Sequence, residues 1–210
     1  MSAASKGVEP GRVGRRRDQA RDAVILDAAL DALADEGFDG MTMDSVALRA
    51  KAGKGTMYRR WPSKAHLVVD AVIQMGQRDV DVDHLPDTGS LRGDLRALLT
   101  KQEGHYDRRR RVQVVAGLVS MLATDTTGLA ETANAACVTP WIDANRTLLQ
   151  RAVDRGEIPV GLEIETLARV IPSMAMYRAS IERKDIDDSF LLAIMDGVLL
   201  PAVGQPPASA

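Results

Sequence analysis

A run of basic side chains between residues 49 and 64 is the part of the sequence best suited to binding an anion. The twenty residues that follow Asp44 contain no acid. Six cationic residues lie among them: Arg49, Lys51, Lys54, Arg59, Arg60 and Lys64. Guanidinium and ammonium groups gathered in this way form a local anionic contact site, which is typical of a surface that binds nucleic acid.

The distribution of charge supports one such site rather than indiscriminate binding. The net charge of the 210 residues is −2. Residues 1–64 hold 12 Lys/Arg and 9 Asp/Glu, whereas the remaining 146 residues hold 15 and 20. A basic patch on an otherwise acidic protein indicates a single anionic partner at that patch.

Two short predicted helices position the basic run. Thr42 is a typical N-cap with Asp44 in the first turn of a helix that ends near Ala50. A second short helix follows the break at residues 51–53 and runs from Lys54 to about Arg60. Two short helices joined by a three-residue turn predict a helix-turn-helix, which presents its second helix to the DNA major groove.

The residues of this segment divide into packing and contact positions. Val46, Ala47, Ala52 and Met57 are expected to pack the two helices together. Tyr58 offers a hydroxyl to a phosphate, and Ser63 begins a further helix whose N-terminus is an anion site. The predicted DNA-contacting set is Thr42, Lys54, Gly55, Thr56, Tyr58, Arg59, Arg60, Ser63 and Lys64.

The rest of the chain predicts an all-α fold of about nine helices. Aromatic residues make up only 3% of the sequence, and no strand-like alternation appears. The predicted organisation is a disordered basic arm at 1–17, a helix-turn-helix domain at 18–62, a ligand-binding and dimerisation domain at 63–204, and a tail at 205–210. Gly37 is expected to end the first helix, and Pro140 to kink or restart a long one.

The sequence resembles the TetR/AcrR family of repressors. The resemblance rests on Ala50-Lys-Ala-Gly-Lys-Gly-Thr-Met-Tyr-Arg-Arg-Trp-Pro-Ser-Lys64, with Ile25-Leu-Asp-Ala-Ala29, Gly37-Phe38 and Thr42-Met43, and covers residues 18–75. Leu149–Ile158 and Asp196–Pro201 are similar to later segments of the family. Two positions depart from its common pattern: Lys51 stands where glycine is frequent, and Gly53 where Ser or Thr is frequent.

This resemblance implies a homodimer that pairs through its last two helices and binds a near-palindromic operator on double-stranded DNA. It also implies a small-molecule pocket in each C-terminal domain, where a ligand would shift the fourth helix and release the DNA. Candidate pocket residues are His105, Tyr106, Met121, Trp141, Met174 and Tyr177, for each of which a core role is the alternative. The scarcity of acids in the apolar helices indicates a hydrophobic effector.

Catalytic and metal sites find little support in the sequence. Nucleophile-elbow, phosphate-loop and zinc-protease motifs are missing, and neither a cofactor nor a metal is expected. Asp79–Asp83 begins like a calcium loop but has His84 and Ser90 where Gly and Glu are required. The single Cys137 excludes an internal disulfide and is expected to be a buried apolar residue. No export signal or membrane-spanning run is recognised, so the protein is expected to be cytoplasmic.

Several interpretations stay open at this stage. Arg12–Arg17 serves either solubility or a minor-groove contact, whereas Trp61 is expected in the core and Arg108–Arg111 at a solvated corner or paired with acids. A helical ligand-binding or scaffolding protein without DNA binding is the rival function. A ligand-independent regulator and an activator are the others.

Overall fold

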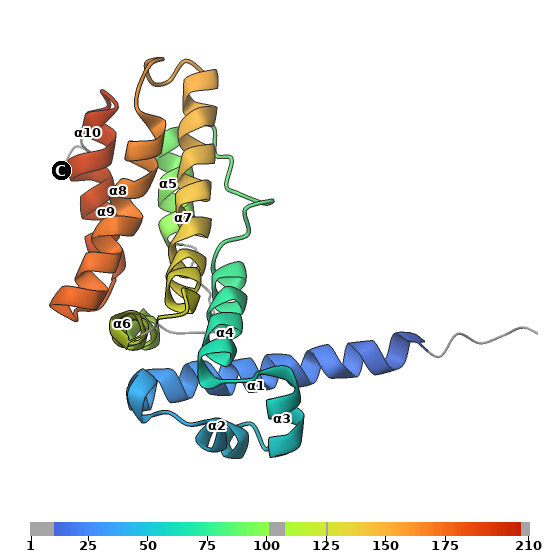
Figure 1. The fold of residues 1–210 in the computed structure, drawn as a ribbon. Helices are drawn as coiled ribbons and strands as arrows, with labels where there is room; N and C mark the ends of the chain where they lie inside the picture. The colour runs from blue at the N-terminus through green and yellow to red at the C-terminus, as the bar shows by residue number, and fades with distance from the viewer. Residues whose placement is uncertain (1–10, 101–107, 125, 207–210) are drawn as a thin grey trace, which may run out of the picture.

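The computed structural model describes residues 11–100, 108–124 and 126–206, and its regular elements are all helices (Figure 1). Within those ranges there is no strand, and nine continuous helical runs follow one another along the chain. The predicted all-α fold of about nine helices is therefore confirmed.

The first four helices form the lower part of the molecule in Figure 1. They are α1 (Gly11–Gly40), α2 (Met43–Arg49), α3 (Lys54–Arg60) and α4 (Lys64–Asp79). The helical run of α1 is broken at Gly37, whose φ of 70° is in the left-handed region that glycine adopts at low cost. This is the position at which the sequence predicts the helix to end.

The N-terminal boundary of α1 differs from the sequence-based expectation. The apolar spacing predicts a start near Asp18, but the helix begins at Gly11. Residues 11–17 of the predicted arm are thus helical, and residues 1–10 lie outside the described ranges. Four of the seven residues 11–17 are arginines, which are good helix formers, and Val13 alone offers a large apolar side chain, so no apolar face marks this part of the helix.

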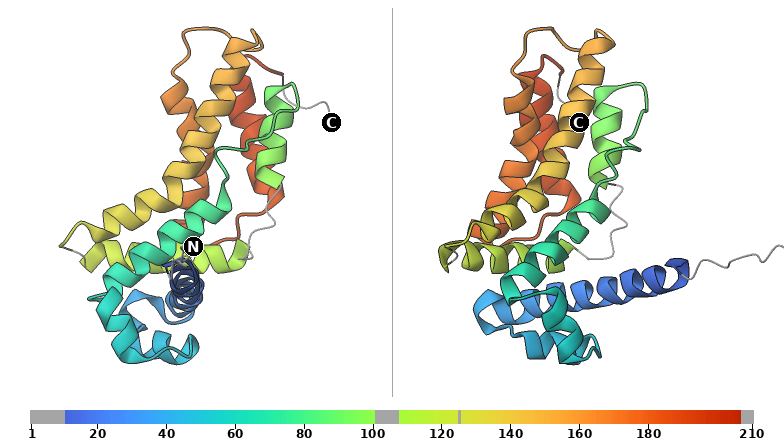
Figure 2. Two further views of the ribbon diagram at one scale, coloured as in Figure 1. Left: turned by 90° about the vertical axis from the view of Figure 1, so that its right-hand side faces the viewer. Right: turned by 45° about the vertical axis from the view of Figure 1, so that its right-hand side comes forward.

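The remaining helices form the upper part. They are α5 (Leu91–Thr100), α6 (Arg108–Thr124), α7 (Leu129–Asp154), α8 (Ile164–Tyr177) and α9 (Asp188–Ile194). A π-helical turn, Arg178–Glu182, continues α8, and a second one, Met195–Leu199, joins α9 to α10 (Leu200–Ala202). Helix α7 runs through Pro140 without a break, and its axis bends in Figure 2, so the predicted kink is found rather than a restart.

Two clusters of buried apolar residues divide the core unevenly. One lies among α1–α4 but also includes Val114, Leu118 and Met121 of α6 and Ala133 of α7. The other joins α5, the C-terminal half of α7, α8 and α9. Because α6 is part of the lower core, the helix-turn-helix is packed directly onto the upper helices.

Close contacts hold these helices in place at two glycines. A Cβ at Gly117 of α6 would lie 2.6 Å from Leu33 Cδ1 of α1, and one at Gly76 of α4 would lie 2.3 Å from the carbonyl oxygen of Ala136 in α7. The α1–α6 and α4–α7 contacts therefore depend on a missing side chain.

Candidate DNA-binding site and internal cavity

Local capping fixes where α2 begins. The Thr42 Oγ1 accepts a hydrogen bond from the Ser45 amide at 3.0 Å, and the Ser45 hydroxyl oxygen accepts one from the Thr42 amide at 3.2 Å. This reciprocal capping box satisfies two amides that the helix itself leaves unpaired. Asp44 lies in the first turn, as the sequence predicts.

The turn between α2 and α3 closes through a left-handed residue. Lys51 has a φ of 49°, and the Ala52 amide donates to the Ala47 carbonyl at 2.9 Å. Val46, Ala47 and Met57 are buried in the core below α1. The helix-turn-helix geometry predicted from the spacing is thereby present, with a lysine at a position that glycine would occupy without strain.

Helix α3 presents one side to solvent. Lys54, Gly55, Tyr58 and Arg59 are exposed, and Tyr58 keeps 53% of its surface accessible. Thr56 is half-buried beside the buried Met57. An added Cβ at Gly55 would meet nothing within 4 Å, so the internal packing places no demand for glycine there.

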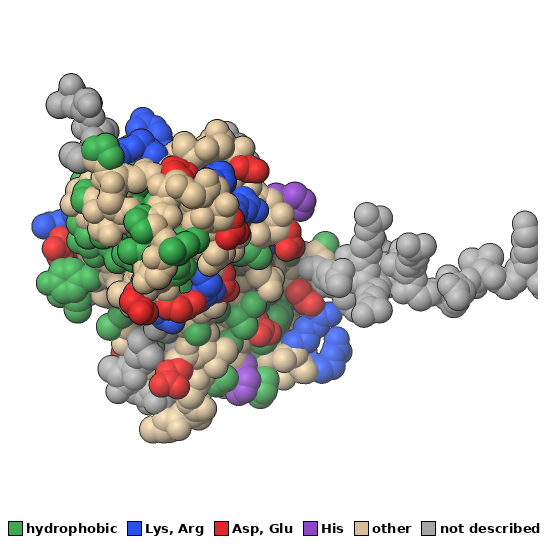
Figure 3. All heavy atoms as spheres, turned by 90° about the horizontal axis from the view of Figure 1, so that it is seen from above, with side chains coloured by type: hydrophobic (Ala, Val, Ile, Leu, Met, Phe, Trp, Pro, Cys, Tyr) green, Lys and Arg blue, Asp and Glu red, His purple; other side chains and the backbone are tan. Residues whose placement is uncertain are grey.

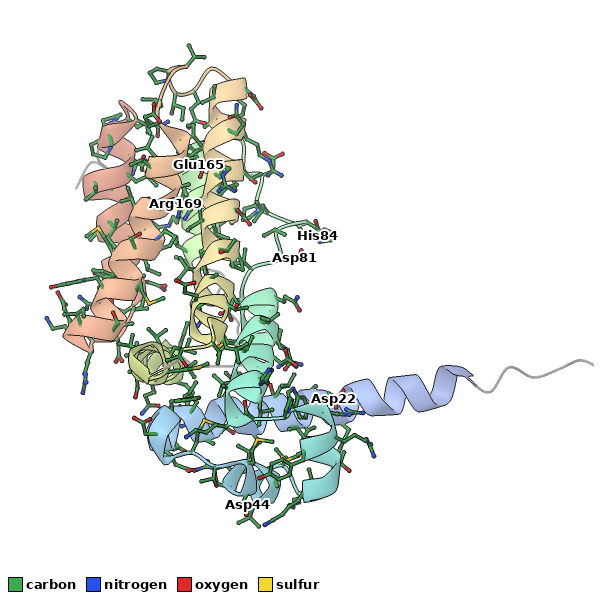
Figure 4. The ribbon with its side chains drawn as sticks, in the orientation of Figure 1. Asp22, Asp44, Asp81, His84, Glu165 and Arg169 are labelled. Atoms are coloured by element: carbon green, nitrogen blue, oxygen red, sulfur yellow. The ribbon has the colours of Figure 1, made fainter. Side chains whose placement is uncertain are left out.

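An acid of α2 already engages the first residue of α3. Lys54 Nζ lies 2.6 Å from Asp44 Oδ2, and both side chains are exposed. The hydrogen bond that Lys54 donates to Asp44 raises the pKa of Lys54, so the lysine stays charged. Figure 4 shows Asp44 at the lower tip of the molecule, on the outer side of α2 and α3.

The three other predicted cationic or capping positions have partners within the protein. Arg60 forms an ion pair with Asp22 of α1, which Figure 4 labels beside α3. Lys64 Nζ donates to the Phe38 carbonyl at 2.7 Å and lies 4.6 Å from the centre of the Phe38 ring. Ser63 caps α4. Arg60 and Lys64 therefore fasten α3 and α4 to α1 in this structure.

Trp61 is buried, as predicted, and its indole nitrogen donates to Asp70 Oδ2 at 2.9 Å.

The expectation that the arginines at 108–111 pair with acids is confirmed for Arg110, which contacts Asp31 at 2.8 Å and Asp35 at 2.5 Å. Asp35 also forms an ion pair with Arg49 of α2, at 2.8 Å. The hydrogen bond from Arg110, followed by that from Arg49, lowers the pKa of Asp35. This network connects α6, α1 and α2, and sequence reasoning did not identify Arg49 and Asp35 as its members.

A cavity of about 80 Å³ lies where helices α4 to α9 meet. Its wall is mainly apolar, with Leu99, Val115, Ile171 and Leu191 among the lining residues. Three ionisable side chains, Asp79, Arg111 and Cys137, also line it. The arrangement suits a small, mostly apolar molecule with one polar group.

The six candidate pocket residues do not come together. Trp141 lines the cavity, whereas Met121 is buried in the lower core. Met174 and Tyr177 are exposed on α8. His105 and Tyr106 lie outside the described residues.

Asp79 and Arg111 form an ion pair at the cavity wall. Arg111 Nη2 lies 2.6 Å from Asp79 Oδ1, and only 12% and 7% of the two side chains is exposed. Burial raises the pKa of Asp79 to about 6 even though Arg111 opposes the shift. Burial also raises the pKa of Cys137 to about 12, which keeps it a thiol.

Among the residues that the structure describes, no group of three or more His, Cys, Asp or Glu side chains is placed to hold a metal ion. None of their helices is both long and apolar enough to cross a membrane.

These features define a helix-turn-helix protein with a second, helical part that encloses a cavity. Two family models match the chain: residues 25–71 match "Bacterial regulatory proteins, tetR family", and residues 85–198 match "Tetracyclin repressor-like, C-terminal domain". The DNA-binding transcriptional repressor TetR of Mycobacteroides abscessus is 33% identical over 190 residues, which cover 88% of this chain and 94% of that protein. The chain therefore belongs to the TetR family and is a DNA-binding transcriptional regulator, not an enzyme.

Solved structures share the fold. A TetR-family regulator of Mesorhizobium loti has a TM-score of 0.70 at 18% identity, covering 90% of this chain and 97% of its own. FadR of Bacillus subtilis, in complex with stearoyl-CoA, has a TM-score of 0.59 at 17% identity, covering 86% of this chain and 96% of its own. Likeness at these identities establishes the arrangement of the helices.

Proposed function

We propose that this regulator is a dimeric repressor that holds a near-palindromic operator in the cytoplasm and releases it when a small molecule enters the cavity. The observation that carries the proposal is the exposed side of α3. The buried side of the same helix, at Met57, packs in the core that also includes residues of α6. A change at the cavity that moves α4 or α6 thereby acts on the recognition helix.

The proposed DNA contacts follow the exposure of the side chains. Lys54, Gly55 and Arg59 lie nearest the base edges, with Thr56 beside them, and Tyr58 donates its hydroxyl to a phosphate. The α2 N-terminus at Thr42 and the α4 N-terminus at Ser63 each face a phosphate. Lys64 joins the phosphate contacts if it leaves the Phe38 carbonyl, while Arg60 keeps α3 in place.

The proposed dimer interface lies on the last two long helices, α8 and α9 with their extensions. Met174, Tyr177 and Ile181 are exposed at helical spacing along α8, and Val198 is exposed on the π-helical turn after α9. In the view from above, Figure 3 shows hydrophobic side chains on the side where α8 and α9 lie in Figure 1. An exposed apolar stripe of this kind supports a protein interface.

The proposed effector site is the cavity between α4 and α9. Support comes from its apolar lining and from FadR, a structural neighbour determined with stearoyl-CoA bound. Trp141 is the one predicted pocket residue that lines this cavity.

The test is selection of genomic fragments by the purified protein at physiological salt. The Lys54→Ala/Tyr58→Ala double variant is compared in parallel, with Lys184→Ala as a control that removes a cation at a distance from α3. Enrichment of a near-palindromic site by wild type and Lys184→Ala, and its loss in the double variant, is the expected result.

Three other results are informative. No enrichment from a folded dimer would favour a helical ligand-binding protein without DNA binding. An operator whose neighbouring genes fall in expression when the regulator gene is deleted would make it an activator. Retention of the operator with every ligand that binds the cavity would make it ligand-independent.

A further inference from the structure

The Asp79–Arg111 pair occupies positions that the helix spacing assigns to the core. Asp79 follows Val68, Val72 and Met75, all buried on α4, at the spacing of one helical face. Arg111 precedes Val115 and Leu118, which are buried on α6. Two charges at core positions cost desolvation energy, and apolar side chains of similar volume would often serve stability equally well.

The two helices that carry this pair are those that reach the DNA-binding part. Helix α4 begins at Lys64, beside α1, and ends at Asp79. Arg110, next to Arg111, contacts Asp31 and Asp35 of α1. The ion pair therefore closes the cavity end of α4 onto the start of α6.

The ionisable groups around Asp79 come from few elements. Arg111 of α6 and Cys137 of α7 line the cavity with it, whereas α8 and α9 contribute apolar residues such as Ile171 and Leu191. Arg78, the neighbour of Asp79 on α4, contacts Asp27 of α1 at 2.7 Å instead. Among the described lining residues, one cation therefore faces one carboxylate.

We propose that the effector is a small monocarboxylic acid with an apolar body, whose carboxylate binds the Arg111 guanidinium and takes the place of Asp79. This inference rests on the proposed function, since it names the ligand class of the same cavity. Binding forms hydrogen bonds from the guanidinium to the ligand carboxylate, opens the bond between α4 and α6, and transfers one proton from solvent to the Asp79 carboxyl.

The asymmetry between the two partners decides the sign of the ligand charge. A guanidinium cannot lose its proton in a protein, so a cationic ligand that claimed Asp79 would leave a permanent charge in an apolar wall. A carboxyl group can become neutral. Two carboxylates beside a single cation in a mainly apolar cavity cannot both stay charged, so one of them takes up a proton.

Burial raises the pKa of Asp79 to about 6, so this carboxyl group takes up a proton more readily than an exposed one. Above this pH the free protein holds Asp79 charged and must take up a proton on binding. Affinity therefore falls by up to tenfold for each pH unit above 6. Between about pH 6 and about pH 8, this amounts to a loss of about 50-fold.

The size of the cavity limits the ligand. A volume of about 80 Å³ corresponds to on the order of six water molecules, which suits a short chain or a single ring. The probes are hexanoate, benzoate and phenylacetate, with hexanamide and hexylamine as neutral and cationic analogues of hexanoate.

The experiment is calorimetric titration of the full-length protein without DNA, at about pH 6 and about pH 8. Two buffers of different ionisation enthalpy report the proton uptake. At least one carboxylate is expected to bind about 50-fold more weakly at the higher pH, with uptake of one proton there. Hexanamide and hexylamine are expected to bind at least tenfold more weakly than hexanoate at the lower pH.

Two variants separate this mechanism from simple packing. Asp79→Asn keeps the shape of the side chain and removes the titrating group, so carboxylate binding becomes insensitive to pH and tighter than wild type at pH 8. Arg111→Gln loses the preference for carboxylate over amide. The thermal unfolding midpoint of each variant verifies that it is folded.

The inference is overturned if none of the three carboxylates binds wild type or Asp79→Asn, if hexylamine binds as well as hexanoate, or if the pH dependence persists in Asp79→Asn. Operator binding is measured separately by fluorescence anisotropy. A protein that holds its operator but binds no carboxylate overturns this inference and leaves the proposed function standing. A protein that binds carboxylate but no DNA overturns the proposed function and leaves the assignment of the ligand class standing.

Discussion

At the scale of single residues, the pair between Asp44 and Lys54 places a carboxylate on the surface proposed to face DNA. Lys54 Nζ is 2.6 Å from Asp44 Oδ2, and both are exposed. In the proposed contact to DNA, Lys54 must give up this partner, and the Asp44 carboxylate repels the DNA backbone. The pair therefore limits non-specific binding, since like charges brought together at an interface lower affinity for every sequence.

Substitution Asp44→Asn tests this interpretation. We expect affinity for both operator and scrambled DNA to rise about threefold to tenfold at low salt, and specificity to fall, because Lys54 becomes available and a repulsive charge is lost. Fluorescence anisotropy over a series of salt concentrations measures both quantities. Asp81→Asn, which removes an exposed carboxylate beyond the end of α4 (Figure 4), is expected to change neither, and equal effects of the two variants would contradict the role of Asp44.

Gly55 separates DNA binding from stability. An added Cβ meets no atom within 4 Å, so Gly55→Ala is expected to leave the free energy of unfolding unchanged or raise it by up to about 1 kcal/mol through helix propensity. Operator affinity is expected to fall at least about tenfold, because the methyl group occupies the space where the backbone approaches the sugar-phosphate chain. Denaturant titration and anisotropy are measured on the same preparation. A variant as tight as wild type would remove Gly55 from the contact surface.

At the scale of elements, local signals predicted the helix starts well. Thr42 and Ser63 each cap the helix that the sequence assigned to them, because a capping side chain acts on amides only two or three residues away. Helix α1 begins earlier than the apolar spacing predicts, at Gly11, because residues 11–17 contain only one large apolar side chain, Val13, and so show no helical pattern.

Contacts between distant residues were beyond the reach of the sequence. Lys64 was predicted to face a phosphate, but its ammonium group contacts the Phe38 carbonyl, 26 residues away. The helical spacing of the sequence does contain one sign of such a contact, because Asp79 falls on the buried face of α4. A charge at a core position indicates a buried partner or ligand, although which arginine pairs with it depends on tertiary packing.

Close packing of α4 against α7 depends on Gly76. A Cβ there would lie 2.3 Å from the Ala136 carbonyl oxygen, so Gly76→Ala must push the two helices apart. We expect the free energy of unfolding to fall by about 1 to 3 kcal/mol, less any gain in helix propensity. Chemical denaturation measures it, and Gly55→Ala is the matched control because it makes the same chemical change on an open surface. A stabilised Gly76→Ala protein would show that the contact yields easily.

At the scale of the whole molecule, the helix-turn-helix and the upper helices are parts of one mechanical unit. The lower core includes residues of α6. Asp35 of α1 forms ion pairs both with Arg110 of α6 and with Arg49 of α2. A cavity at the C-terminal end of α4 and a recognition helix at its N-terminal end are thereby connected by packed side chains and ion pairs. In the proposed dimer, the direction and size of any motion depend on the second subunit, since a dimer fixes the distance between its two recognition helices.

The last prediction concerns the proposed dimer interface. Ile181 on the extension of α8 is 63% exposed and follows Met174 and Tyr177 at the spacing of one helix face. Ile181→Asp places a charge in that interface while costing the single subunit little, because the side chain is exposed there. We expect sedimentation analysis to show monomers at concentrations where wild type is dimeric. Operator affinity is expected to fall about 100-fold or more, because one dimer no longer holds two half-sites together.

The matched control for this variant is Val160→Asp. Val160 is 81% exposed in the turn between α7 and α8, at the far end of α8 from Ile181 (Figure 1). It makes the same change from an exposed apolar residue to an acid, so a general effect of charge on solubility or DNA repulsion would appear in both variants. Loss of the dimer in Ile181→Asp alone would place the interface on this part of α8. If both proteins stay dimeric, the subunits pair through another surface, and the spacing of the recognition helices must be derived from that surface instead.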